Sequence, residues 1–125
     1  MIREQVDITK NSQNEYGLVI DNSALLQTET VEYTTAQSGT VLVTGESGYL
    51  TEIRALVITT DGTSGEVKVG FDGGNFIKMY VSKQNQLSVT GINIRGNEGE
   101  DLKVWTTTGT DAVFIGVNYI QRKKL

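Results

Sequence analysis

The chain has 125 residues, enough for one domain with a buried core, and 38% of its residues are hydrophobic. It contains no histidine, cysteine or proline, which excludes Ser-His-Asp and Cys-His catalysis, disulfides and the usual zinc sites. A net charge of -4 opposes nucleic-acid binding, which depends on neutralising phosphates.

The apolar runs of the chain are short, as at residues 55–58. A helix that crosses a bilayer needs roughly 20 apolar residues, so the sequence predicts no membrane-spanning helix. Residues 1–5 show no apolar core of a secretory leader, and we therefore expect synthesis in a cytoplasm.

Residues 1–28 differ in composition from the rest of the chain. They are mostly polar, with apolar islands at 16–20 and 24–26 on either side of a turn-forming Asp-Asn-Ser cluster. We interpret 1–28 as an N-terminal segment and 29–125 as the folded domain. The segment either packs on its own domain or extends as an arm that docks on a neighbouring subunit, since the islands have no apolar partner within it.

From residue 29 onward the pattern is that of short strands closed by glycine-rich turns. Polar and apolar residues alternate at 31–35, and further strands are predicted at 40–44 and 49–60. The strand at 49–60 carries apolar residues on both faces near Leu56 and Ile58. This predicts either a central position in a sheet or contact with another subunit.

The next two strands form the clearest hairpin of the sequence. Apolar residues occupy every second position at 66–71, so one face of this strand is expected to be exposed to solvent. The sequence Asp-Gly-Gly-Asn at 72–75 suits a tight turn, because glycine readily adopts positive φ angles. The return strand is predicted at 76–81.

The remaining strands complete an all-β protein. The apolar phase of residues 87–94 changes at Gly91, which predicts a β-bulge. Further strands at 102–106 and 112–120 bring the total to about eight, with turns at roughly 8–12-residue intervals. The pattern therefore predicts an antiparallel β-sandwich.

Carboxylates are the remaining candidates for catalysis. A glycoside hydrolase needs two of them about 5 to 10 Å apart. Glu52, Glu66 and Asp72 lie on predicted strands or at their ends. Because Glu66 alternates with apolar residues, we interpret such positions as a solvated strand face and expect no enzyme activity.

The acidic loop at 97–101 is the best candidate for a metal site. Calcium takes about six to eight oxygen ligands, and Glu98, Glu100 and Asp101 supply three carboxylates. Their spacing is far from that of an EF-hand, and acidic loops are usually just solvated. We therefore expect no cofactor.

Exposed aromatic side chains commonly serve as stacking platforms for sugars on β-sandwiches. The candidates here are Tyr49, Phe76, Tyr80 and Trp105. Trp105 is out of phase with its apolar neighbours, so it faces solvent, a second layer or another subunit. A carbohydrate-binding module is thus one functional hypothesis.

Four segments resemble small virion proteins of tailed bacteriophages in their general residue pattern, without a diagnostic motif. They are SGTVLVT at 38–44, VTGINIRG at 89–96, LKVW at 102–105 and FIGVNY at 114–119. Virion proteins of this kind are auxiliary capsid components (decoration or head-fibre proteins) or minor tail components, often jelly-roll β-sandwiches that associate as trimers. The resemblance carries no catalytic residue to this chain.

The resemblance implies a jelly-roll-like decoration protein that binds and stabilises the head shell of a virion. Its partners would be the major capsid protein or other virion subunits and further copies of itself, favouring a homotrimer, with no nucleic acid or membrane. It would be made in the host cytoplasm. The alternative is the carbohydrate-binding module. The residues expected at subunit interfaces are Tyr16, Leu18, Ile20, Leu25, Leu26, Leu56, Ile58 and Trp105.

Overall fold

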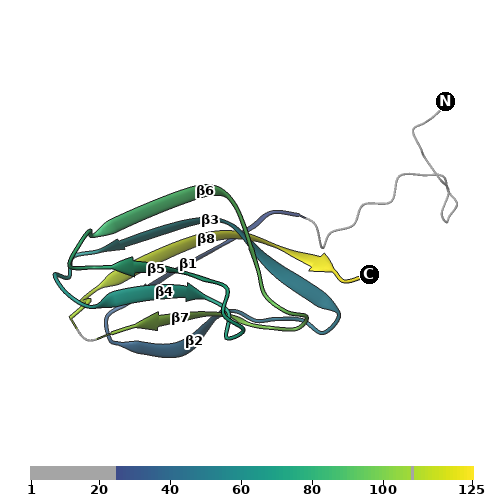
Figure 1. Cartoon of the computed structure of the whole chain (residues 1–125), viewed down its shortest axis with the longest axis horizontal. Coiled ribbons are helices and arrows are strands. Elements are labelled where there is room, and N and C mark those ends of the chain that lie inside the picture. The colour runs from purple at the N-terminus through teal and green to yellow at the C-terminus, as the bar shows by residue number, and fades with distance from the viewer. Residues whose placement is uncertain (1–24, 108) are drawn as a thin grey trace, which may run out of the picture.

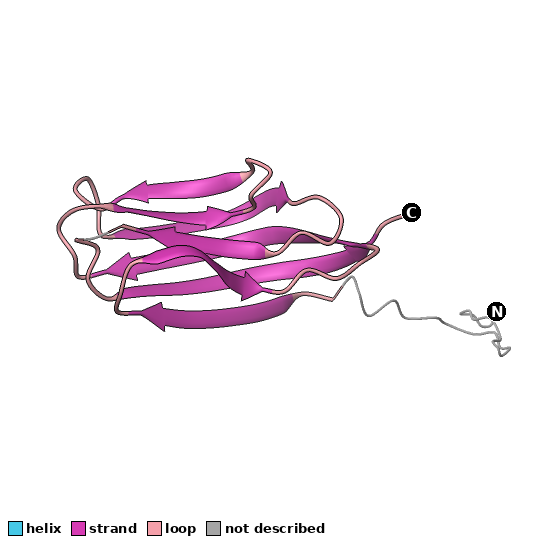
Figure 2. Ribbon diagram, turned by 90° about the horizontal axis from the view of Figure 1, so that it is seen from below, coloured by secondary structure: helices cyan, strands magenta, loops and turns pink. Residues whose placement is uncertain are grey.

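The computed structural model describes residues 25–107 and 109–125, and eight β-strands form its regular structure there (Figure 1, Figure 2). Within these ranges, no helix is long and apolar enough to cross a membrane. The strands are β1 (Gln27–Tyr33), β2 (Gln37–Val43), β3 (Tyr49–Thr60), β4 (Glu66–Gly70), β5 (Phe76–Tyr80), β6 (Gln86–Arg95), β7 (Leu102–Thr106) and β8 (Val113–Lys123).

The strands form two antiparallel sheets of four, with the orders β1-β8-β3-β6 and β2-β7-β4-β5. The chain passes from one sheet to the other at every connection except the β4–β5 hairpin. This strand order is that of a jelly roll, which consists of two Greek keys folded into a double sheet. The predicted all-β, jelly-roll-like sandwich is therefore confirmed.

The core lies between the two sheets. Away from the register shifts in β2, β3 and β6, the strands turn most alternate side chains inward, as the sequence pattern predicts. The apolar residues with at most 1% of their surface exposed are Ile53, Leu56, Ile58, Val67, Val69, Leu102, Val104, Val113, Ile115 and Val117. Full burial of one such side chain stabilises the fold by about 1.5–3 kcal/mol, so this shared interior holds the sheets together.

The long strand β3 lies between β6 and β8 near the centre of its sheet. Leu56 and Ile58 point into the core, with 1% and 0% of their surface exposed. The prediction that these two residues line a subunit interface is therefore wrong, because the domain's own opposite sheet already covers them. Val57 is the residue of this segment that faces outward, and 39% of its surface is exposed.

The edge strand β6 contains the predicted bulge. Gly91 adopts a φ of 68°, which favours glycine, and the pairing of β6 with β3 shifts register there. As a result, Leu87 before the bulge and Ile92 and Ile94 after it all pack against the core, and Val89 is half-buried. The bulge keeps both halves of β6 in contact with the sandwich.

Candidate interaction surfaces

The outer surface of the β1-β8-β3-β6 sheet is nearly free of charge at its centre. We call this surface the threonine-rich face. Strand pairing and the alternation of burial along the strands assign twelve positions to it, of which only Glu32 is charged. They are Thr28, Thr30, Glu32, Ala55, Val57, Thr59, Gln86, Ser88, Thr90, Phe114, Gly116 and Asn118.

A shallow apolar groove of about 250 Å³ crosses the middle of the threonine-rich face. Its floor includes Gly116, where a Cβ atom would lie 3.6 Å from the Phe114 ring and 3.8 Å from the Thr30 methyl group. Val57 lines the groove from β3. Phe114 and Val57 each expose 39% of their surface, so the groove presents apolar surface to solvent.

One end of the same sheet carries an arginine cluster around a buried carboxylate. Glu52 is 1% exposed, and its oxygens lie 2.9 Å from Arg95 Nη2, 3.3 Å from Arg122 Nε and 4.0 Å from Arg54 Nη1. Three cations around one anion leave a local charge of +2. The arginine side chains are 43–48% exposed, so this charge faces solvent.

The outer surface of the β2-β7-β4-β5 sheet has a different chemistry. We call the cluster of Lys68, Phe76, Lys78, Tyr80 and Trp105 the aromatic–lysine face. The Lys68 ammonium lies 4.2 Å from the Trp105 ring centroid and 4.8 Å from that of Phe76. The Lys78 ammonium lies 5.6 Å from the Tyr80 centroid and 5.8 Å from that of Phe76. These are cation–π distances.

Two lysines on this sheet are also held by carboxylates. Lys78 lies 3.1 Å from Glu66, and this hydrogen bond raises the pKa of the Lys78 ammonium above its usual value. Lys103 donates to Asp72 at 2.6 Å, which likewise raises the pKa of Lys103. Both ion pairs are at the surface and contribute little to stability.

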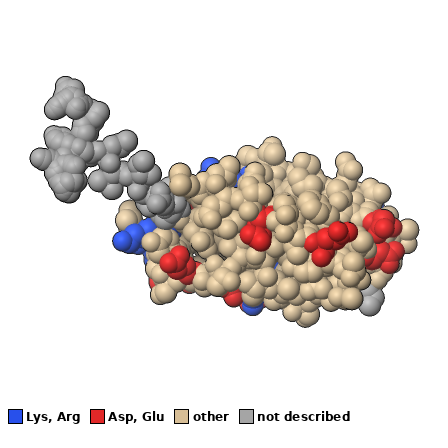
Figure 3. All heavy atoms as spheres, turned by 180° about the vertical axis from the view of Figure 1, so that it is seen from behind, with Lys and Arg blue, Asp and Glu red and all other residues tan. Residues whose placement is uncertain are grey.

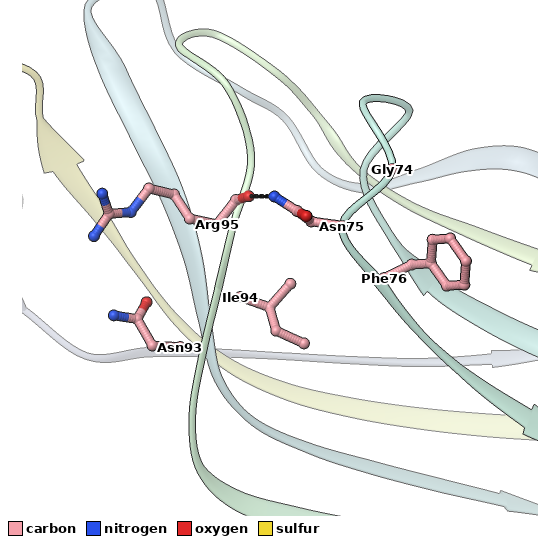
Figure 4. Close-up of a pocket in the computed structure, with 6 residues that line it drawn as sticks. All are labelled: Gly74, Asn75, Phe76, Asn93, Ile94 and Arg95. Carbon is pink, nitrogen blue, oxygen red and sulfur yellow. Dashed lines mark hydrogen bonds between the residues drawn. The ribbon is translucent and has the colours of Figure 1, made fainter.

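A cleft of about 400 Å³ lies where the edges of β5 and β6 approach each other (Figure 4). Asn75 Nδ2 donates to the Arg95 carbonyl oxygen at 2.7 Å and ties the β4–β5 turn to β6. Figure 4 shows the Arg95 and Phe76 side chains extending to opposite sides, with Ile94 between them. The Asn75 amide nitrogen is already engaged by the β6 backbone, and the Arg95 guanidinium does not face the Phe76 ring.

The carboxylates proposed for calcium are separated by the structure. Asp101 accepts from Gly45 N–H at 2.7 Å, and Glu98 accepts from Gly48 N–H at 2.9 Å. Glu100 accepts from the N–H groups of Gly73 and Asn97. Across the described ranges, no three acidic side chains gather to hold a metal ion. These three carboxylates, the best candidate ligands in the sequence, bind loop amides instead of converging on one point.

The interface candidates from the N-terminal segment are only partly within the described residues. Tyr16, Leu18 and Ile20 lie outside the described residues. Leu25 and Leu26 are 52% and 61% exposed, next to the start of β1.

Trp105 is half-buried on the outer side of β7. Phe76 and Tyr80 lie on the outer side of β5 in the same sheet, whereas Tyr49 belongs to β3 in the other sheet. Three of the four proposed sugar platforms thus share one sheet.

The three carboxylates considered for catalysis are engaged in separate ion pairs. Glu52 lies within the arginine cluster, Glu66 binds Lys78 and Asp72 binds Lys103. They are divided between the two sheets and line none of the clefts described above. The structure does not assemble them into a facing pair.

The sequence reasoning missed the groove and the arginine cluster. Phe114 is out of phase with Val113 and Ile115, and a glycine follows two residues later, which is a local signal of an exposed ring beside a gap. The arginines carry no such signal, because the three are separated by up to 68 positions (122 − 54) in the sequence.

No protein-family description matches this sequence, and no curated protein matches it either. Solved structures do match its fold. A chain from the acid-stable capsid of the Helicobacter pylori bacteriophage KHP30 aligns with a TM-score of 0.57 and 13% identity, over 78% of this chain and 88% of that chain. A chain from Bacillus endospore appendages, described as disulfide-linked pili, aligns with a TM-score of 0.52 and 11% identity, over 86% and 97%.

At these identities, the comparisons establish a shared fold. The jelly roll of this chain is similar to that of a phage capsid chain over most of both lengths.

Proposed function

We propose that this chain is a structural protein of a tailed-bacteriophage virion, made in the host cytoplasm, that attaches to the head shell as an auxiliary or decoration subunit. The proposal is carried by one observation: this chain is a jelly roll, similar in fold to a phage capsid chain, and its threonine-rich face presents a nearly uncharged apolar groove. Its partners are the major capsid protein or neighbouring virion subunits. Its role is mechanical and not catalytic.

The threonine-rich face suits attachment to another protein. Binding becomes less favourable when a charged group is buried in the interface without a partner, because the group loses its hydration. Eleven of the twelve outward positions here are uncharged, and Val57 and Phe114 supply apolar area. Exposed apolar patches rimmed by polar residues commonly mark protein interaction sites. The net charge of -4 opposes DNA as the partner.

A particle-binding experiment tests this role. Heads assembled without the chain are mixed with the purified protein, sedimented and then heated. We expect the protein to co-sediment and to raise the temperature at which the heads release DNA. Val57→Lys is expected to weaken binding at least tenfold, whereas Tyr80→Lys on the other sheet is not. Heads that neither bind the protein nor gain stability from it contradict the proposal.

A carbohydrate-binding module is the second candidate, and the aromatic–lysine face favours it. Phe76 and Tyr80 are 41% and 53% exposed and share this face with Trp105. Trp105 is the single tryptophan of the chain, so its fluorescence reports on this face alone. Glycan binding there predicts a saturable emission shift that Trp105→Phe abolishes and Val57→Lys leaves unchanged. A broad glycan panel without any shift argues against it.

A further inference from the structure

The aromatic–lysine face alternates aromatic rings with ammonium groups across three strands. Each ammonium lies 4.2–5.8 Å from the centroids of two rings. We propose that this face binds an acidic polysaccharide, with sugar units against Phe76 and Tyr80 and a carboxylate or phosphate group at Lys68. The inference rests on the carbohydrate-binding role given above as the second candidate, and it names the class of glycan.

Lys68 supplies a positive charge that the rings attract but do not cancel. It lies directly opposite Lys78 on the neighbouring strand, which brings two like charges together. Glu66 neutralises Lys78 at 3.1 Å. Within the described ranges no carboxylate forms an ion pair with Lys68, whose ammonium lies close to the Trp105 and Phe76 rings instead. Two cations and one anion leave a local charge of +1.

The hydrogen-bonding groups of this surface favour an acidic ligand over a neutral one. A lysine ammonium offers three donors and no acceptor. The carboxylates beside the face are already occupied, because Glu66 accepts from Lys78 and Asp72 accepts from Lys103. A neutral sugar hydroxyl needs an acceptor as well as a donor to satisfy it. Carboxylate and phosphate oxygens only accept, and they form stronger hydrogen bonds with an ammonium than a hydroxyl does.

The rings supply the apolar surface on which sugar units pack. Phe76 and Tyr80 are 41% and 53% exposed, and they lie on the same side of β5. Trp105 lies close over the neighbouring strand β2, since a Cβ atom at Gly39 would be 3.4 Å from its Nε1 atom. The rings and ammonium groups extend over β4, β5 and β7, which span about 10 Å at a strand spacing of about 4.8 Å. This extent suits a polymer better than a single sugar.

Local charge decides where a polyanion can bind to this chain. The net charge is -4, but exposed charges are screened over about 8 Å at physiological salt, so a polymer responds to the charges nearest to it. On the side of the molecule shown in Figure 3, acidic side chains lie along the face and at one end, and basic ones gather near the other end. The arginine cluster, which belongs to the other sheet, is therefore the rival site for an anion.

The two proposed roles use different surfaces. The aromatic–lysine face and the threonine-rich face belong to different sheets of the sandwich, and each sheet turns one face outward. A subunit that attaches to a head through the threonine-rich face directs the aromatic–lysine face away from the shell. Each face thus has one occupant, and the acidic polysaccharide is bound on the side that faces the medium.

Fluorescence titration of the full chain with two matched pairs of polysaccharides tests the inference. Polygalacturonate is compared with its methyl ester and phosphomannan with mannan, because the members of each pair share their sugars and differ in charge. We expect the acidic member of at least one pair to shift the Trp105 emission at a concentration at least about fivefold lower than the neutral member. Raising sodium chloride from about 50 to about 500 mM should remove most of this preference.

Variants separate the roles of charge and ring. Lys68→Gln should abolish the preference for the acidic member and leave the response to the neutral member unchanged. Arg54→Gln, in the arginine cluster, should preserve the preference. Tyr80→Ser should weaken the binding of both members, and thermal unfolding confirms that each variant is folded. Polyglutamate, an acidic polymer without sugars, should bind more weakly than the acidic polysaccharide.

Three results overturn the inference: equal affinity for the acidic and neutral members of both pairs, a preference lost in Arg54→Gln but kept in Lys68→Gln, or equally tight binding of polyglutamate. If neutral polysaccharides still bind, the carbohydrate-binding role stands without this choice of glycan. If no polysaccharide shifts the emission, both the inference and the carbohydrate-binding role are wrong. Head binding through the threonine-rich face is measured separately and depends on neither result.

Discussion

At the scale of single residues, Glu52 is the unusual charge of this domain. It is 1% exposed, yet Arg54, Arg95 and Arg122 all direct their guanidinium groups at it. The carboxylate joins β3 to β6 and β8 through these contacts. Without it, three cations would face each other at one end of the sheet.

Replacing this carboxylate should destabilise the fold. Glu52→Gln leaves a buried neutral amide among three arginine cations, and we expect the free energy of unfolding to fall by about 1–3 kcal/mol. The arginines are half-exposed and partly solvated, which keeps the loss smaller than for a fully buried ion pair. Urea unfolding measures the change. Glu66→Gln, which removes one surface ion pair, should cost less than about 1 kcal/mol. Equal effects of the two variants would refute a special role for Glu52.

One buried and one half-buried tyrosine make the fold sensitive to alkali. Burial raises the pKa of both Tyr119 and Tyr33, and the Glu29 carboxylate adds to the shift of Tyr119. A group with a raised folded-state pKa stabilises the fold fully below its unfolded pKa and loses this contribution as the pH rises through the folded value.

The thermal unfolding midpoint should therefore decline above roughly pH 10, the ordinary tyrosine pKa. The pKa values of Lys78 and Lys103 are also raised, and their ion pairs are lost in the same direction. Tyr119→Phe removes one titrating group from the core and should flatten the decline. A midpoint that stays constant from pH 8 to pH 11 contradicts this assignment.

At the scale of elements, the bulge in β6 depends on the backbone of Gly91. Its φ is 68°, and a Cβ atom there would meet no other atom within 4 Å. Gly91→Ala therefore isolates the conformational cost, which should lower stability by about 1–2 kcal/mol. Gly116→Ala is the control, because that glycine has no positive φ and should be neutral or stabilising. Chemical denaturation that finds the two variants equal would show that the bulge is not held by Gly91.

Most elements could be predicted because their signals are local. The 49–60 strand, the turn at 72–75 and the phase change at Gly91 all depend on neighbouring residues. The sequence could not show which side chains of Leu56, Val57 and Ile58 point into the core, because all three are apolar and the alternation that distinguishes inside from outside is missing. Only the pairing with β8 and the opposite sheet assigns Val57 to solvent.

At the scale of the whole molecule, the candidate surfaces depend on contacts between distant parts of the chain. The arginine cluster joins residues from β3, β6 and β8, and the aromatic–lysine face joins β4, β5 and β7. The sequence pointed to Trp105, Phe76 and Tyr80 as outward aromatics but not to their common sheet. The sequence also could not show what the acidic loop does, because carboxylates that bind backbone amides look like metal ligands in sequence.

The two sheets divide the proposed tasks. The threonine-rich face is suited to contact with protein, and the aromatic–lysine face remains available on the opposite side for a glycan or another partner. A jelly roll permits this division because each sheet turns one face to the core and one outward. Variants on one face should therefore leave the other function unchanged.

Quantitative mass spectrometry of gradient-purified particles tests the central claim most directly. If the chain is an auxiliary head protein, it should be present in intact particles in a fixed ratio to the major capsid protein, and it should remain with heads separated from tails. Its absence from purified particles, when the lysate that produced them contains it in quantity, would contradict the account.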